Sequence, residues 1–240
     1  MNASRTARER ARAELTSEIK EEARRQLAVA GADGMSLRAV ARELGMVSSA
    51  VYRYFPSRDE LLTALIIDAY QSLGDAAETA EAAVARTDLR GRWRATCRAA
   101  RHWALAHPHE YALIYGSPIP GYKAPEDTVA QAIRVPLAIV EVLRESWAAG
   151  TLVVPDDDLR PILAEQTAAL AELIAPELPG PVLARALVAW SQLYGMISFE
   201  LFGQFVGSVD PAAEFFDHTV DLMATFTGLP ADTSERPATA

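Results

Sequence analysis

The chain has 240 residues, 50% of them hydrophobic and 23% charged, a composition typical of a globular protein with a sizeable core. No apolar run reaches about 18 residues without a charge or a turn signal, so no membrane span is expected. The polar first residues also lack the apolar stretch of a secretory signal. A single cysteine, Cys97, excludes an internal disulfide and a cysteine-cluster metal site, and a cytoplasmic location is expected.

The net charge of −9 argues at first against a nucleic-acid partner, but the charge is unevenly divided. Residues 1–60 hold 11 basic and 9 acidic side chains, a net +2, whereas residues 61–240 hold the other 12 and 23, a net −11. Ten of the 11 basic residues in the first part are arginines, which can bind phosphates and guanines with two hydrogen bonds. The first quarter of the chain is therefore the part suited to DNA.

The chain begins with an arginine-rich stretch. Residues 1–15 are expected to form a disordered arm, and an arm that contacts the DNA backbone or minor groove is an alternative that stays open. A first helix is predicted over Thr16–Ala30, because apolar residues recur there at helical spacing and Gly31 ends the pattern.

Two short helices joined by a tight turn are predicted next. Apolar residues from Leu37 to Leu44 recur at i, i+3, i+4 and i+7, with Ser36 as the N-cap and Gly45 as the stop. Ser48 is expected to be the N-cap of a second short helix, which ends before Pro56. Helix, glycine turn and helix form the helix-turn-helix pattern.

The outer face of the second helix is predicted to face DNA, because it is small, polar and cationic. Small residues let the backbone approach a groove, and hydroxyl and guanidinium groups can reach phosphates and base edges. The residues of this face are Ser48, Ser49, Ala50, Tyr52 and Arg53. Ser57 and Glu60 then form a capping box, and Arg58 lies at that helix N-terminus, where a phosphate is favoured.

The segment from Ser36 to Leu62, with VYRYFPSRDELL at its centre, resembles the DNA-binding module of the tetracycline-repressor (TetR) family. The shared pattern is an apolar residue, Tyr, any residue, Tyr or His, Phe, and then a Lys or Arg that opens the next helix. It runs here from Val51 to Arg58, with arginine where lysine is commoner. The resemblance implies a dimeric regulator of transcription, a repressor rather than an activator, that binds a pseudo-palindrome in double-stranded operator DNA.

The expected DNA contacts combine the polar face with the positions that the resemblance implies. Tyr52, Tyr54 and Arg58 are expected on the sugar–phosphate backbone, and Ser48, Ser49, Ala50 and Arg53 at or near base edges. Arg38 is expected to contact either a base or a phosphate. The full set is Ser36, Arg38, Ser48, Ser49, Ala50, Tyr52, Arg53, Tyr54 and Arg58.

The rest of the chain stays helical in pattern, which predicts an all-α fold. We expect a three-helix helix-turn-helix domain over residues 16–60, a larger effector-binding and dimerisation domain over 61–228, and a disordered tail over 229–240. The later helices are predicted near residues 58–85, 89–106, 109–115, 128–149 (kinked at Pro136), 161–175, 182–205 and 211–227.

All four tryptophans follow the helix-turn-helix, which indicates either ordinary helical core or an apolar pocket with a few polar groups. The segments RHWALAHPHEYALIYG and AWSQLYGMISFELFG resemble a C-terminal domain of one branch of the TetR family. That resemblance implies a small apolar or amphipathic effector that releases DNA. The residues expected to line its pocket are Cys97, His102, Trp103, Tyr111, Tyr115, Trp147, Trp190 and Tyr194.

The last two predicted helices are apolar around much of their circumference, more than one internal contact requires. They are therefore expected to form a four-helix bundle with the same helices of a second copy. The residues expected at this dimer interface are Leu187, Leu193, Ile197, Leu201, Phe215, Phe216, Val220 and Met223.

The main alternative is an enzyme, either a helical small-molecule-binding or a metal-dependent one. The run His107-Pro108-His109-Glu110 could suggest a metal site, but the proline breaks the helix and no second cluster completes a tetrahedral set. The sequence also has no glycine-rich phosphate loop and no Gly-x-Ser-x-Gly turn. No catalytic residue, metal or cofactor is expected.

Overall fold

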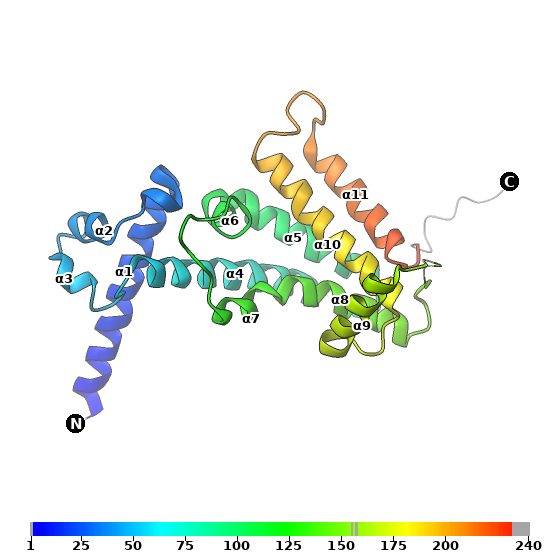
Figure 1. Ribbon diagram of the computed structural model, residues 1–240, viewed down its shortest axis with the longest axis horizontal. Coiled ribbons are helices and arrows are strands. Elements are labelled where there is room, and N and C mark those ends of the chain that lie inside the picture. Colours follow the sequence, from blue (N-terminus) through cyan, green and yellow to red (C-terminus); the bar gives the residue numbers. More distant parts are fainter. Residues whose placement is uncertain (1, 155, 157, 232–240) are drawn as a thin grey trace. The chain divides into compact units, whose positions relative to one another are not determined.

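The computed structural model describes residues 2–154, 156 and 158–231, and every regular element in this part of the chain is a helix (Figure 1). The all-α fold expected from the sequence is confirmed. The helices are α1 (Asn2–Gly34), α2 (Leu37–Glu43), α3 (Ser48–Val51), α4 (Arg58–Ala82), α5 (Leu89–Ala106), α6 (Pro108–Tyr115), the 3-10 turn η1 (Glu126–Thr128), α7 (Val129–Ala132), α8 (Arg134–Ala148), α9 (Pro161–Ile174), α10 (Gly180–Leu201) and α11 (Ala212–Phe226).

The chain divides into two compact units. The first unit contains the residues up to Gln71 together with His107–Ala132, and the second contains Ser72–Ala106 together with the residues from Ile133 onward. Helix α4 contributes residues to both. These compact units are a different division from the functional domains expected over residues 16–60 and 61–228, which stay a prediction.

One apolar core lies beneath α1, α2, α3 and the start of α4 in the first unit. Its buried residues are Ile19, Ala23, Leu27, Met35, Leu37, Val40, Ala41, Val51, Phe55, Leu61, Leu62 and Leu65. Helix α6 and the loop after it belong to the same unit, because Leu113, Ile119 and Tyr122 pack against this core. The Tyr122 hydroxyl also lies 2.8 Å from the Thr63 hydroxyl. The helix-turn-helix is thus packed against a segment some 50 residues further along the chain.

Helix α1 is longer than the sequence pattern predicts. The expected disordered arm over residues 1–15 is wrong, because α1 is helical from Asn2. Alanine, arginine and glutamate dominate this stretch, and these residues favour a helix even without an apolar stripe. The expected break after Ala30 does occur, since Gly31 has a non-helical backbone with φ 68° and ψ −179°. Positive φ is readily adopted only by glycine.

The second unit is a bundle in which α10 packs against α5, α8, α9 and α11, while α5 packs against α8 and α11 (Figure 1). Its α10 is long and apolar enough, by length and composition alone, to cross a membrane, with a mean hydropathy of 1.2 over its best window. A core helix of a soluble protein meets the same criterion. Only 44% of that window is buried within the chain, however.

The single kinked helix predicted over 128–149 is instead two helices, α7 and α8, separated at Ile133. In a continuous helix the Pro136 ring would meet the carbonyl of Ala132 and would leave that carbonyl without its bond. The chain avoids this conflict by ending α7 at Ala132. Pro136 then lies in the first turn of α8, where its missing N–H is not needed.

Two helix ends also differ from expectation. Helix α10 stops at Leu201 and not near Phe205, because Gly203 adopts a φ of 75° that ends the helix. The predicted tail begins too early, since Leu229 is buried and its N–H donates to the Ala224 carbonyl at 3.0 Å. The rest of the predicted tail falls on residues 232–240, which lie outside the described residues.

Candidate DNA-binding surface

The turn between α2 and α3 has the geometry that a helix-turn-helix requires. Helix α2 ends in a Schellman motif, in which Met46 N–H donates to the Ala41 carbonyl at 2.8 Å and Gly45 N–H donates to the Arg42 carbonyl at 3.1 Å. Gly45 has a φ of 65°, and an added Cβ there would meet open space, so the backbone conformation alone demands glycine. Helix α3 then starts at Ser48 with Val47 as its N-cap.

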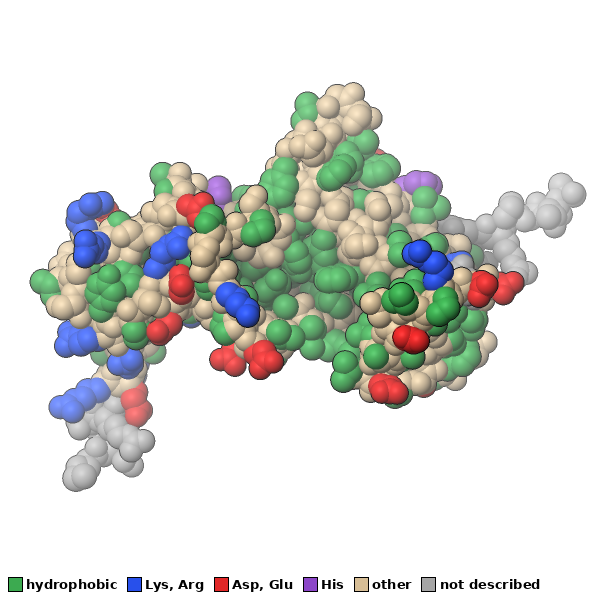
Figure 2. Space-filling view, viewed as in Figure 1, with side chains coloured by type: hydrophobic (Ala, Val, Ile, Leu, Met, Phe, Trp, Pro, Cys, Tyr) green, Lys and Arg blue, Asp and Glu red, His purple; other side chains and the backbone are tan. Residues whose placement is uncertain are grey.

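The polar residues around α3 are mostly accessible. Arg38, Ser49 and Arg53 are exposed, and 41% of Tyr52 is exposed. Ser36 and Ser48 are half-buried. Several Lys and Arg side chains lie on the surface of the unit that contains α1, α2 and α3 (Figure 2). The exposed residues of the helix-turn-helix are therefore two that carry hydroxyl groups, Ser49 and Tyr52, and two arginines, Arg38 and Arg53.

Ala50 differs from the prediction, because only 9% of it is exposed and it faces the core. Helix α3 has four residues, and the inward side of this single turn must carry Ala50 and Val51 together to close over α2. The outer face is consequently narrower than the sequence suggested. Its solvent-facing residues are Ser49, Tyr52 and Arg53.

Tyr54 and Arg58 are both held by other parts of the first unit. The Arg12 guanidinium of α1 lies 5.1 Å from the centre of the Tyr54 ring, a cation–π distance. The Arg58 guanidinium donates to the Ala32 carbonyl at 2.6 Å and lies 3.9 Å from the Asp33 carboxylate. Arg58 thus joins the start of α4 to the last turn of α1, after the kink at Gly31, and this geometry does not support the phosphate contact expected of it.

The start of α4 follows the capping prediction. The Glu60 N–H donates to the Ser57 hydroxyl at 3.1 Å, which is the serine half of the expected capping box. This cap sets the first turn of α4 directly after Pro56, which ends the segment that follows α3.

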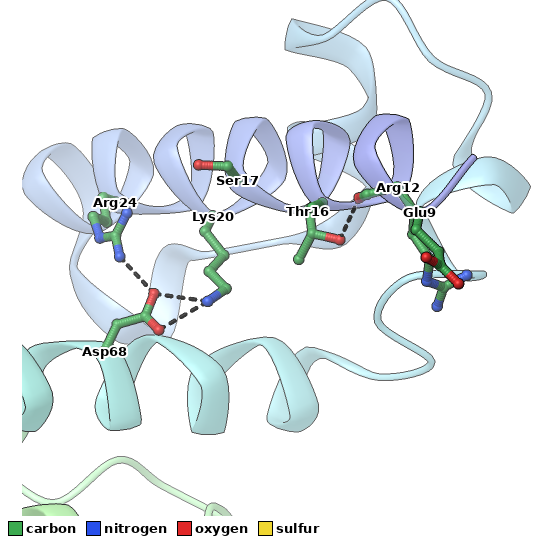
Figure 3. Close-up of a pocket in the computed structure, with 8 residues that line it drawn as sticks. Glu9, Arg12, Thr16, Ser17, Lys20, Arg24 and Asp68 are labelled. Carbon is green, nitrogen blue, oxygen red and sulfur yellow. Dashed lines mark hydrogen bonds and ion pairs between the residues drawn. The ribbon is translucent and has the colours of Figure 1, made fainter. Parts of the chain in front are cut away.

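A groove of about 430 Å³ runs along α1 beside α4 (Figure 3). At one end Lys20 and Arg24 of α1 both bind the Asp68 carboxylate of α4, at 2.8 and 2.7 Å. Arg24 also binds Glu110 of α6 at 2.9 Å. At the other end Arg12 and Glu9 lie together, away from Asp68 (Figure 3). At one end of the groove the charges of Lys20 and Arg24 are therefore paired with carboxylates of the chain, and the other end lies near Tyr54.

The residues predicted for an effector pocket are divided between the two compact units. Tyr111 and Tyr115 belong to the first unit, with ring centres 5.2 Å apart, and the other six belong to the second. Trp103 is buried and its indole N–H donates to the Ser72 hydroxyl at 2.9 Å. Cys97 is also buried, and this burial raises the pKa of its thiol to about 12. His102, Trp147 and Trp190 are exposed, and Tyr194 packs edge-on against Trp190.

Helix α9 lines a hollow of about 590 Å³ with the start of α10 in the second unit. Its walls include Ala164, Thr167, Ala171 and Leu178, none of which the sequence singled out. The alanine content of α9 was the available signal, since small residues leave space beside a neighbouring helix. Among the described residues, no group of three or more His, Cys, Asp or Glu side chains is placed to hold a metal ion.

The predicted dimer residues need a correction. Five of the eight are core residues of the chain itself: Leu193, Ile197, Phe216, Val220 and Met223. Leu201 is half-buried, and only Leu187 and Phe215 are exposed, at 39% and 37%. The large apolar residues that are exposed on these helices were mostly missed: Leu187, Val188, Trp190, Phe199, Phe215, Leu222 and Phe226. Both helices are apolar on more than one side, so periodicity alone could not tell the inner face from the outer one.

Comparisons with known proteins agree with this architecture. The profile of "Bacterial regulatory proteins, tetR family" matches residues 19–65, and that of "Tetracyclin repressor-like, C-terminal domain" matches residues 93–223. The chain is 40% identical over 221 residues to the HTH-type transcriptional regulator Rv1816 of Mycobacterium tuberculosis, which covers 89% of this chain and 93% of that protein. The regulator Mb1846 of Mycobacterium bovis matches equally well.

Two solved structures are similar over most of their length. The regulatory protein SCO4313 is 39% identical, covers 90% of this chain and 98% of its own, and superposes with a TM-score of 0.72. A protein of unknown function from Rhodococcus sp. RHA1 is 27% identical, covers 90% and 96%, and has a TM-score of 0.68. Together with the helix-turn-helix geometry, these matches show that the chain belongs to the TetR family of bacterial transcriptional regulators.

Proposed function

We propose that the chain is a ligand-responsive repressor that acts in the cytoplasm, binds a pseudo-palindromic operator as a homodimer, and is released by a small apolar or amphipathic effector. The observation that carries this proposal is the exposed polar face of α3, held by the Schellman turn after α2 over a fully apolar core. Within the part of the chain that the structure describes, the Ser49, Tyr52 and Arg53 side chains point to solvent, whereas DNA supplies both phosphates and base edges.

Ser49, Tyr52 and Arg53 make the central contacts with the major groove. Arg53 is exposed and can bind a guanine through two hydrogen bonds, which discriminates against other bases by about 1–3 kcal/mol. Tyr52 and the exposed Arg38 of α2 reach phosphates and set the position of α3. Ser36 and Ser48, both half-buried, contribute hydroxyl contacts at the helix starts, while Ala50 supports the turn from inside.

The dimer forms through the exposed apolar face of α10 and α11. This face carries Val188, Phe199, Leu222 and Phe226, each at least 39% exposed. The two charged residues of α10 are satisfied within the chain: Glu200 binds Arg101 at 2.6 Å, and Arg185 lies over the Phe226 ring. A Cβ added at Gly195 would meet open space, so a second helix can approach α10 closely there. A two-fold axis would pair this face with itself.

The effector acts through the part of the chain that matches the tetracycline repressor-like C-terminal domain, residues 93–223. Residues 61–228 would form the effector and dimer domain, and residues 16–60 the DNA-reading domain. Helix α4 has residues in both compact units, which supports it as the coupling element. An effector that binds the released form with about 1–3 kcal/mol more free energy would lower operator affinity roughly 5- to 150-fold.

The proposal is tested by selecting bound fragments from random duplex DNA with the purified protein and then sequencing them. A pseudo-palindrome with two equal half-sites is the expected result. Arg53→Ala should then lose preference at one base pair of each half-site, while Arg25→Ala, a loss of the same charge on α1, keeps the preference. Recovery of unrelated fragments at low salt, also after the protein has been unfolded and refolded to remove any bound effector, would contradict specific recognition.

A further inference from the structure

The first turns of α1 carry the excess positive charge of the DNA-reading part of the chain. Residues 16–60 hold seven basic and seven acidic side chains and are neutral in sum. Residues 1–15 hold four arginines against two glutamates, which accounts for the whole net +2 of residues 1–60. The long-range attraction of this part for a polyanion therefore comes from the N-terminal extension of α1 and not from the helix-turn-helix.

This extension is an exposed helix that is fixed to the first unit at its base. Residues 6–14 are exposed, whereas Leu15 packs against the apolar core and Ile19 is fully buried. The Thr16 hydroxyl donates to the Arg12 carbonyl at 2.8 Å within the same helix. A continuous helix from the core outward holds its side chains in defined directions, unlike a flexible arm.

Arg12 connects the extension to the residues that follow α3. Its guanidinium lies 5.1 Å from the centre of the Tyr54 ring, and Tyr54 follows the exposed Tyr52 and Arg53 in the chain. A cation–π contact does not use the N–H groups of a guanidinium, so those of Arg12 can still donate to a phosphate. Arg8 lies one helical turn before Arg12 and so on the same side of α1.

We propose that the extension of α1 is a second DNA-contact surface, on which Arg8 and Arg12 bind backbone phosphates that flank the half-site read by α3. The proposal rests on the proposed function for the identity of the duplex, but the contact itself is independent of base sequence. Arg10 points away from this side, because it is about 200° around the helix from both Arg8 and Arg12. Glu9 lies beside Arg12 and would face the same phosphates (Figure 3).

The test is the salt dependence of binding to duplex DNA, measured both on the selected operator and on an unrelated duplex of equal length. Each lost phosphate contact lowers the slope of log K against log salt by about 0.9. In a dimer, Arg8→Gln together with Arg12→Gln should lower the slope by about 3 to 4 on both duplexes. Arg10→Gln, the matched control, should change the slope by less than one contact's worth.

Two further variants separate this contact from a loss of folding. Arg8→Gln alone leaves the Tyr54 contact intact and should still lower the slope by about 2 in the dimer. Glu9→Gln should act in the opposite direction and tighten binding, because it removes a carboxylate that repels phosphate. Hydroxyl-radical footprints should lose the protection outside the half-sites in the double variant and keep the protection within them.

Unchanged slopes and footprints in the double variant would overturn the α1 contact, even if the operator is bound as proposed. The α1 contact would also be overturned if Arg10→Gln lowered the slope as much as Arg8→Gln does. The slope would then depend on the net charge of the extension and not on the position of each arginine. If no specific operator exists, the measurement on the unrelated duplex still decides the question. The failure of the α1 contact and the failure of the proposed function are therefore distinguishable.

Discussion

Each of the two compact units is stabilised internally, and the kinds of contact inside them differ. The first unit has one apolar core, and its main cluster of ion pairs, around Asp68, lies at the edge of a groove. The second unit adds arginine–carboxylate pairs between helices that are far apart in the sequence. Arg92 of α5 is completely buried, where it binds Glu81 of α4 and Glu145 of α8. The first unit therefore depends on apolar packing, and the second also on charges that must find their partners.

A row of arginines on α5 sets the rotation of α11 in the second unit. Arg94 binds Asp221 at 2.5 Å and Arg98 binds Asp217 at 2.8 Å. These pairs hold the acidic edge of α11 against α5. The same orientation of α11 buries Phe216, one residue from Asp217, and exposes Leu222, one residue from Asp221. The ion pairs and the buried apolar residues of α11 are therefore consistent with one orientation, in which an apolar face remains exposed.

The largest expected effect is the loss of the buried arginine. Arg92→Met should lower the free energy of unfolding by about 3–5 kcal/mol, because it leaves Glu81 and Glu145 without their buried counter-charge. Arg98→Met, whose pair is nearly half exposed, should cost less than about 1 kcal/mol. Urea unfolding followed by circular dichroism measures both. Equal losses in the two variants would contradict the distinction between buried and exposed pairs.

An apolar replacement of the whole cluster sharpens this comparison. Arg92→Met combined with Glu81→Leu and Glu145→Leu should recover most of the stability, since a buried ion cluster of this kind is often no better than apolar residues of similar volume. The exposed Arg86, which also binds both glutamates, would then lose two partners but remain solvated. A triple variant as unstable as Arg92→Met would contradict this expectation. It would indicate that the three charged side chains make contacts that apolar residues of similar volume cannot replace.

The second prediction concerns the exposed face of α10 and α11. Val188→Glu or Leu222→Glu should yield folded monomers, because each places a charge in the proposed dimer contact and none in the core. Leu193→Glu should instead unfold the second unit, since Leu193 is completely buried. Light scattering gives the mass and circular dichroism the helix content. A dimer that persists in both exposed variants would move the interface elsewhere.

The sequence was informative where the contacts are local. The helix-turn-helix, with its Gly45 turn and its Ser57 cap, lies within about 25 consecutive residues, so spacing and residue type were sufficient to predict it. Ala50 was misassigned because a four-residue helix has too few positions to reveal its faces. The acidic residues of α11 that lie beside α5 pair with Arg94 and Arg98, which are more than 100 residues away, and periodicity carries no information about such pairs.

The residues expected to bind an effector stay a prediction, and their composition alone could not decide their role. Aromatic composition indicates core or pocket equally well, and Trp103 and Cys97 turned out to be buried core residues. The helical extension of α1 was missed because it has no apolar stripe. Its helix propensity, and not amphipathicity, was the available signal.

The third prediction uses the single cysteine as a probe of the second unit. Burial raises the pKa of the Cys97 thiol from 9.0 to about 12, so at pH 8 the native protein carries the neutral thiol and hardly any reactive thiolate. A thiol reagent such as DTNB should react only as fast as the second unit unfolds. Because the pKa of Cys97 is higher in the folded state than in the unfolded state, Cys97 makes its full contribution to the free energy of unfolding below pH 9. This contribution to the free energy of unfolding falls by about 1.4 kcal/mol for each pH unit between about 9 and 12.

Rapid labelling of native Cys97 at pH 8 would show that its surroundings open without global unfolding. That result would also revive Cys97 as a group accessible to an effector. The control is the rate of reaction in 8 M urea, where the thiol is exposed and the pKa is ordinary.

The smallest expected effect is at an exposed ion pair of the second unit. A hydrogen bond from Arg144 lowers the pKa of Glu177 below its ordinary value of 4.5. Because the folded pKa is the lower one, the pair stabilises the fold above about pH 4.5 and this contribution disappears as the pH falls through the folded pKa. Arg144→Met should return the Glu177 pKa toward 4.5 in an NMR titration while leaving the urea midpoint at pH 7 almost unchanged, since exposed pairs contribute little. A large fall of that midpoint would mean that the surface pairs of the second unit stabilise it as the buried Arg92 cluster does, and the contrast between its buried and exposed charges would no longer hold.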